Sequence, residues 1–94
     1  MPNTVKLLIV DDERIALRNL EHVMKKEGYD VTSTQSGMNA LKLLDEMQFD
    51  VVLTDLRMEK VDGMQVLAKS RERHPDSEVI MITGFATLDS AVDA

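Results

Sequence analysis

Three carboxylates follow two strongly apolar runs, at the point where each run ends. Residues 7–10 lead directly into Asp11 and Asp12, and residues 51–54 lead into Asp55. A short continuous apolar run is typical of a strand that is buried on both faces, as in parallel sheets. Ligands of open parallel sheets bind just beyond the carboxyl ends of the strands. If the two strands are neighbours, the three acids meet there, and like charges so close together are unfavourable unless a cation lies among them.

The donor atoms favour magnesium over zinc or copper. All three side chains offer oxygen, and Mg²⁺ is commonly held by one or two carboxylates together with phosphate oxygens and waters. His22 and His74 do not lie near the acids in the expected fold and are interpreted as surface residues. A simpler interpretation of Asp11 and Asp12 stays open, because acidic residues also cap helix N-termini and interact favourably with the helix dipole.

Strand and helix patterns alternate along the chain. The expected strands are 5–10, 31–34, 49–54 and 78–82, and the expected helices are about 13–27, 37–47, 62–73 and one that begins near residue 87. Asp12 is placed to cap the first helix and Ser36 the second. Val23 and Met47 are expected on the inward faces of these two helices. The alternation predicts right-handed crossovers and a doubly wound α/β fold with a parallel sheet.

Length and composition limit the class of protein. A 94-residue chain suits one small domain, so residues 1–94 are interpreted as a single domain. The absence of cysteine excludes disulfides, thiolate zinc sites and cysteine nucleophiles, and fits a cytoplasmic protein. A net charge of -6 argues against direct binding of nucleic acid, and no apolar run is long enough for a membrane span. No glycine-rich phosphate-binding loop or catalytic serine motif occurs, so we expect no nucleotide site.

The fourth expected strand is apolar throughout residues 79–82, and only one short helical pattern follows it. An apolar strand at the edge of a sheet tends to pair with another chain. We therefore expect that the sequence stops before a fifth strand. We also expect that the edge formed by the fourth strand and the following helix supports self-association.

Three ordered motifs resemble one family closely. Residues 8–13 (LIVDDE), residues 55–58 (DLRM) with Asp62-Gly63, and residues 80–84 (IMITG) resemble the receiver domains of two-component response regulators. Residues 83–92 are similar to receivers of the nitrogen-regulation class of transcription activators. The resemblance implies a flavodoxin-like, doubly wound sheet with strand order 2-1-3-4, of which the fifth strand and helix are missing from this sequence.

The resemblance also implies a role for each site residue. Asp55 would accept a phosphoryl group from a sensor histidine kinase, so the domain would be a regulatory phosphoacceptor rather than an enzyme. Mg²⁺ would be held by Asp11, Asp12 and Asp55, with the backbone carbonyl of Arg57 as a further ligand. Thr83 would contact the phosphoryl group and shift the surface around the fourth helix. That surface would control an output domain, C-terminal in the full protein, that acts on transcription.

Two departures from the family pattern stand out. Glu59 occupies the place where the family usually has proline, and Lys69 is the last lysine of the chain. Receivers carry a lysine and a switch aromatic on the fifth strand, and neither is present here. The sequence is compatible with two other functions: a protein-interaction or dimerisation module with vestigial acids, and a small metal-dependent phosphatase, which the lack of a nearby general acid disfavours.

Overall fold

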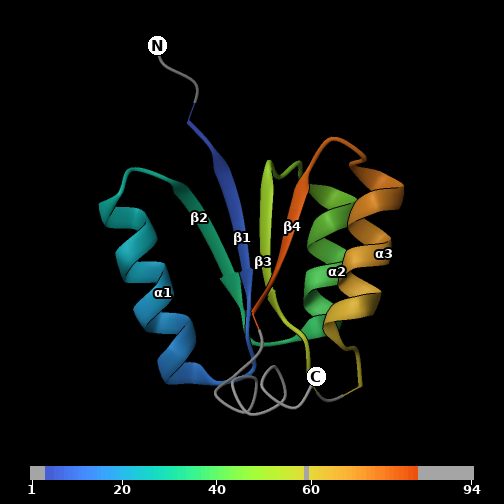
Figure 1. Cartoon of the computed structure of the whole chain (residues 1–94), viewed down its shortest axis with the longest axis horizontal. Coiled ribbons are helices and arrows are strands. Elements are labelled where there is room, and N and C mark those ends of the chain that lie inside the picture. Colours follow the sequence, from blue (N-terminus) through green and yellow to red (C-terminus); the bar gives the residue numbers. More distant parts are fainter. Residues whose placement is uncertain (1–3, 59, 83–94) are drawn as a thin grey trace, which may run out of the picture.

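One parallel sheet with helices on both faces forms the domain (Figure 1). The computed structural model describes residues 4–58 and 60–82. The strands are β1 (Lys6–Val10), β2 (Asp30–Thr34), β3 (Val51–Asp55) and β4 (Glu78–Ile82), and the helices are α1 (Arg14–Lys26), α2 (Gly37–Glu46) and α3 (Gly63–Arg73). The order β2-β1-β3-β4, with every neighbouring pair parallel, confirms the doubly wound α/β sheet predicted from the sequence. The fourth predicted helix lies outside the described residues.

The central strand β1 contributes to two hydrophobic cores. Leu8 and Val10 pack with residues of α2 and α3, and Leu7 and Ile9 pack with residues of α1. All four side chains are at most 3% exposed. Successive strand residues point to opposite faces, so a strand that is covered on both faces must be apolar throughout.

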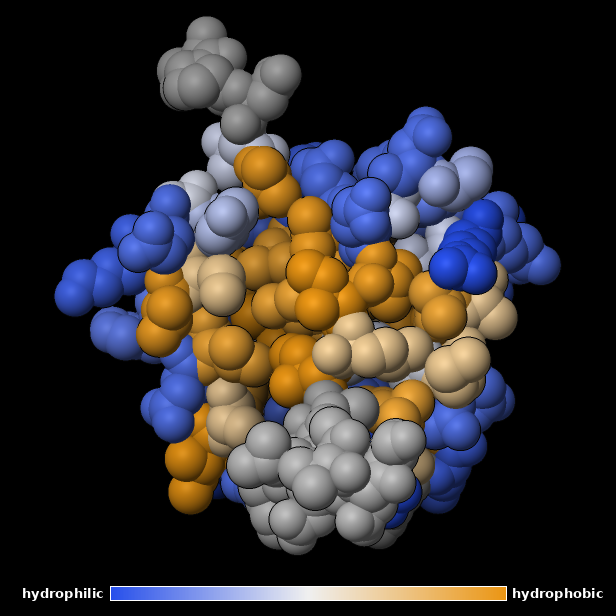
Figure 2. All heavy atoms as spheres, viewed as in Figure 1, coloured by the Kyte–Doolittle hydropathy of each residue, from blue (hydrophilic) through white to orange (hydrophobic). Residues whose placement is uncertain are grey.

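The two faces of the sheet are covered unequally within the described residues. Helices α2 and α3 lie together against one face, whereas α1 alone lies against the other (Figure 1). In the same view, apolar residues gather over the sheet between α1 and β4 (Figure 2). Ile80 of the outer strand β4 is 51% exposed. An exposed apolar residue on an outer strand is a potential contact for another chain.

Two residues expected to point inward do not. Val23 is 49% exposed, because the stripe of α1 that contacts the sheet consists of Leu17, Leu20 and Met24, and Val23 lies beside that stripe. Met47 is 42% exposed because it follows the last residue of α2 and has an extended backbone. The predictions that Val23 and Met47 point inward were therefore wrong.

The helices begin with side-chain caps, with one difference from the expectation. Ser36 caps α2 as predicted, since its hydroxyl accepts a hydrogen bond from the amide of Asn39 at 3.1 Å. The predicted cap of α1 by Asp12 is wrong, because the helix starts one residue later with Glu13 as its N-cap. Asp12 is thereby left exposed beside the end of β1.

His74 has a structural role that its interpretation as a surface residue missed. Its Nε2 lies 2.8 Å from the carbonyl oxygen of Leu44, so it links the C-terminal ends of α3 and α2. His22, in contrast, is exposed on α1, as expected. None of the helices among the described residues is long and apolar enough to cross a membrane.

Candidate metal centre at the carboxyl ends of the strands

The three carboxylates meet at one edge of the sheet, as the sequence predicts. β1 and β3 are neighbours and Val10 pairs with Thr54, so Asp11 and Asp55 follow at the same level. Carboxylate oxygens of Asp11, Asp12 and Asp55 lie within 4.8 Å of one another. Two adjacent strand ends therefore gather three acids into one cluster, which we call the acidic triad.

Asp11 is the most constrained member of the acidic triad. Its side chain is 5% exposed, its amide donates a hydrogen bond to the carbonyl of Thr34 at 3.2 Å, and its Oδ1 accepts one from the amide of Glu13 at 2.8 Å. Burial raises the pKa of Asp11, the Glu13 amide opposes that rise, and the charges of Asp55 and Asp12 add to it. Without a cation, the ionised form of Asp11 is thus held in an unfavourable environment.

Asp55 is the last residue of β3 and is half-buried. Its Oδ1 lies 3.4 Å from the amide nitrogen of Arg57, a long hydrogen bond. The hydroxyl of the preceding Thr54 donates to the carbonyl oxygen of Asp55 at 3.1 Å. One carboxylate oxygen of Asp55 therefore contacts the following loop, and the other accepts no hydrogen bond from the described residues.

The loop after β3 is held in place at its far end by Gly63. A Cβ atom on Gly63 would lie 2.4 Å from the carbonyl oxygen of Asp55 and 2.9 Å from the Cα of Leu56, which only glycine avoids. The amide of Gly63 also donates to the carbonyl of Leu56 at 2.9 Å. The sequence predicts a helix that begins at about residue 62. That helix start is found, and Gly63 in addition fixes the backbone next to Asp55.

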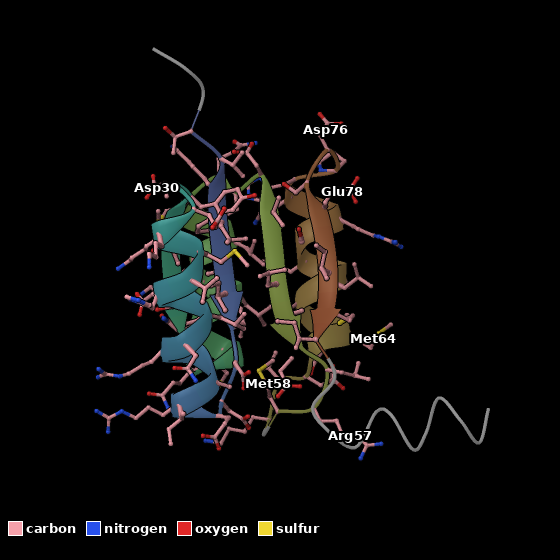
Figure 3. The ribbon with its side chains drawn as sticks, turned by 60° about the vertical axis from the view of Figure 1, so that its left-hand side comes forward. Asp30, Arg57, Met58, Met64, Asp76 and Glu78 are labelled. Atoms are coloured by element: carbon pink, nitrogen blue, oxygen red, sulfur yellow. The ribbon has the colours of Figure 1, made fainter. Side chains whose placement is uncertain are left out.

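The side chain of Arg57 extends away from the domain, whereas Met58 lies beside the ends of the strands (Figure 3). Arg57 is exposed. Because its side chain extends away from the domain, only its backbone is placed to contact the acidic triad. Met58 packs against the core on the α2–α3 side. The Arg57 carbonyl was expected to be a metal ligand, and that role stays a prediction. Thr83, expected to contact a phosphoryl group, lies outside the described residues.

A hollow of about 380 Å³ adjoins the acidic triad. It is bounded by the start of α2 and by the loop after β3, and Asp12 is its only lining residue from the acidic triad. The other lining residues are Gln35, Ser36, Gly37, Met38, Met58 and Lys60.

The acidic triad fits a hard divalent cation. Its ligand atoms are all oxygen, and no lysine or arginine among residues 4–58 and 60–82 forms an ion pair with it. Other surface acids, such as Asp30, Asp76 and Glu78, lie at the opposite end of the sheet and take no part (Figure 3). Crowded carboxylates of this kind suit Mg²⁺ or a similar ion, so the site is able to bind a metal.

Comparison with known protein families identifies the domain. The profile of the response regulator receiver domain matches residues 7–94, so the chain belongs to the receiver-domain family of two-component systems. A receiver is a regulatory phosphoacceptor rather than a conventional enzyme.

The similar curated proteins are transcriptional regulators. The chain is 37% identical over 92 residues to the alginate biosynthesis transcriptional regulatory protein AlgB of Pseudomonas putida, covering 98% of this chain and 20% of that protein. It is 38% identical over 88 residues to the transcriptional regulatory protein GlrR of Escherichia coli, covering 94% of this chain and 20% of that protein. Both are activators of the nitrogen-regulation class, which confirms the finer resemblance. The chain spans about a fifth of the length of these relatives.

Solved receiver structures share the fold. A receiver-domain protein from Clostridium thermocellum superposes with a TM-score of 0.81 at 33% identity, covering 94% of this chain and 71% of the other. The response regulator TrrA of Thermotoga maritima, solved in complex with Mg²⁺-BeF, has a TM-score of 0.81 at 28% identity, covering 93% of this chain and 76% of that one. A receiver of similar fold can therefore hold Mg²⁺ together with BeF.

Proposed function

We propose that this chain is the phosphoacceptor domain of a two-component system, in which a sensor histidine kinase transfers a phosphoryl group to Asp55. Asp11, Asp12 and Asp55 hold Mg²⁺, and the backbone carbonyl of Arg57 completes the protein ligands. Phosphorylation alters the surface around Thr83 and the helix expected after it, and so regulates a C-terminal output domain that controls transcription. The domain acts in the cytoplasm.

The observation that carries this proposal is the meeting of the three carboxylates at the ends of β1 and β3. A lone carboxylate at a strand end is common. A cluster with one buried acid of raised pKa and no paired lysine or arginine among the described residues is costly unless a cation offsets it.

The chemistry requires positioning more than reactive groups. A carboxylate oxygen of Asp55 attacks phosphorus in line, the bond between phosphorus and the histidine nitrogen breaks, and that nitrogen keeps the electron pair. The Arg57 amide orients the Asp55 carboxylate through the 3.4 Å contact, which leaves the other oxygen to react. When bound, Mg²⁺ supplies charge neutralisation for the phosphoryl oxygens.

The test is phosphorylation by a small donor such as acetyl phosphate with Mg²⁺, followed by intact-mass spectrometry. We expect the wild-type chain to gain one phosphoryl group, Asp55→Asn to gain none, and Asp45→Asn to behave like the wild type. Asp45 is a suitable control because it is an exposed aspartate that pairs with Lys69 and Arg73 instead. Equal incorporation into Asp55→Asn would show that the acceptor is another residue, and no incorporation into the wild type would contradict the proposal.

A second candidate function, self-association, is favoured by β4. This outer strand exposes half of Ile80. Apolar residues also gather over the sheet between α1 and β4 (Figure 2). Sedimentation velocity over a range of concentrations tests the idea. We expect a dimer that Ile80→Lys dissociates without loss of helical circular dichroism, and a monomer at all concentrations would exclude this function.

A further inference from the structure

The start of α2 lies directly against the loop that follows β3. A Cβ atom on Gly37, the first residue of α2, would lie 2.4 Å from the carbonyl oxygen of Val61 and 2.8 Å from its Cβ. Only glycine allows two backbone segments to approach so closely. Val61 itself is 7% exposed and belongs to the core shared with Leu8 and Val10. The loop is therefore pressed between the core and the first turn of α2.

A buried hydroxyl sets the position of that first turn. Thr34, the last residue of β2, is 7% exposed, and its Oγ1 accepts hydrogen bonds from the amide of Ser36 at 3.2 Å and from Nδ2 of Asn39 at 3.0 Å. Both partners flank Gly37. The backbone carbonyl of the same Thr34 accepts a hydrogen bond from the amide of Asp11 at 3.2 Å. One residue thus contacts the backbone of a triad member and also positions the turn that supports the loop.

The supported loop carries the backbone expected to complete the metal site. Asp55 precedes it, Arg57 lies within it, and Gly63 closes its far end against the Asp55 carbonyl. Lys60 has a φ of 66°, a left-handed conformation that costs free energy for any residue other than glycine and persists only where the surroundings impose it. The contact between Gly37 and Val61 lies one residue from Lys60.

We propose that Thr34 and Gly37 are positioning residues for Mg²⁺ binding: through the close contact with Val61 they hold the loop after β3 where the Arg57 carbonyl can complete the ligands offered by the acidic triad. The inference rests on the proposed function for its metal readout. It concerns residues that touch neither the ion nor the phosphoryl group. Groups behind the primary ligands commonly change metal affinity by about 10- to 100-fold when they are replaced.

The experiment measures Mg²⁺ affinity by titration followed with ¹H–¹⁵N NMR. Gly37→Ala adds only a methyl group, which the fixed backbone of Val61 cannot accommodate without moving, so we expect Mg²⁺ to bind about 10-fold more weakly. Gly28→Ala is the matched control: Gly28 has a φ of 97° and nothing within 4 Å of an added Cβ. It should lower the melting temperature through backbone strain and leave the Mg²⁺ affinity unchanged.

A second pair of variants covers the case in which Gly37→Ala fails to fold. Thr34→Val keeps the shape and the backbone carbonyl but removes the hydroxyl, whereas Thr34→Ser keeps the hydroxyl. We expect Thr34→Val to weaken Mg²⁺ binding by about 10-fold and Thr34→Ser to bind like the wild type. Equal affinity for Thr34→Val and the wild type, or for a folded Gly37→Ala and the wild type, would overturn the inference.

A metal-free measurement separates this inference from the proposed function. In the absence of Mg²⁺, Gly37→Ala and Thr34→Val should shift the amide signals of Arg57 and Val61, while Gly28→Ala should not. If the wild type binds no Mg²⁺, the proposed function fails, but these shifts still test the contact. If Arg57 keeps its wild-type signal in both variants, the loop is not positioned by α2 and the inference is wrong.

Discussion

Two clusters of charged side chains in this domain, the acidic triad and the ion pairs of Asp45, bring distant parts of the chain together in opposite ways. In the acidic triad, three carboxylates approach within 4.8 Å and no described lysine or arginine pairs with them. In the other cluster, Oδ1 of Asp45 in α2 forms ion pairs with Nζ of Lys69 at 3.0 Å and with Nε of Arg73 at 2.8 Å, and both partners belong to α3. Burial raises the pKa of Asp11, whereas Lys69, followed by Arg73, lowers the pKa of Asp45. The charge of Asp45 is thus balanced by side chains of the protein itself, whereas the acidic triad suits a cation from solution.

The largest difference between the two clusters should appear on adding Mg²⁺. Because Mg²⁺ binds the folded acidic triad and not the unfolded chain, the free energy of unfolding should rise by about 2.7 kcal/mol at a free concentration 100 times Kd. Urea denaturation with Mg²⁺ or with EDTA measures the increase. Asp45→Asn should respond as the wild type does. Equal stability in Mg²⁺ and EDTA would mean that the acidic triad is not a metal site.

Removing one charge from the acidic triad should stabilise the metal-free protein. Asp11→Asn keeps the Oδ1 acceptor for the Glu13 amide and removes repulsion that amounts to about 1 kcal/mol for charges about 4 Å apart in water. For a domain of this size, that corresponds to about 4–8 °C in melting temperature. The variant should also lose its response to Mg²⁺. A lower melting temperature in EDTA would show that the charge of Asp11 is already compensated.

The pH dependence of the same variant gives a finer test. The pKa of Asp11 is raised in the folded state, so between its ordinary value of 3.8 and the raised value the folded protein holds more protons than the unfolded one. Metal-free stability attributable to Asp11 is therefore highest at low pH and falls as pH rises through this window. The advantage of Asp11→Asn over the wild type should grow across the window and become constant above it. An advantage that does not change with pH would contradict this assignment.

The smallest effect is expected at Asp45. Exposed ion pairs contribute little to the free energy of unfolding and are screened by salt. Asp45→Asn should therefore lower the melting temperature by a smaller amount than the increase expected for Asp11→Asn. The decrease should become smaller in 1 M NaCl. A large decrease that persists in salt would show that the link between α2 and α3 depends on more than these charges, for example on the contact of His74 with Leu44.

The acidic triad could be predicted from the sequence because its position follows from strand ends alone. Any two neighbouring parallel strands bring the residues after them together, so the apolar runs before Asp11 and Asp55 were sufficient once the strand order implied by the family resemblance made the two strands neighbours. The support by Thr34 and Gly37 could not be predicted in the same way. It depends on a close approach between the start of α2 and the loop after β3, and a glycine at the start of a helix gives no sign of which backbone it meets.

The errors at the ends of the helices have a related origin. Helical spacing identifies an apolar stripe, but the width of sheet that a helix covers depends on its neighbours. Leu17 is buried and Val23, which lies beside the contacting stripe, is not. His74 was misassigned because a carbonyl at the end of another helix is invisible in the local sequence. The helical pattern thus located the centre of the apolar stripe but not its edge, and the local sequence gave no sign of the contact between His74 and Leu44.

The burial of β1 on both faces has a consequence for the timescale on which the site opens. The amide of Asp11, directly after β1, donates a hydrogen bond to the carbonyl of Thr34. The four β1 residues that precede Asp11 are at most 3% exposed. Amides in such positions exchange with solvent deuterium mainly when the whole domain unfolds, whereas amides in loops exchange through local openings. Asp11 should thus be among the slowest sites to exchange and the Arg57 amide, with its 3.4 Å bond, among the faster ones. Two groups expected to contact the same ion would then belong to separate cooperative units of the fold.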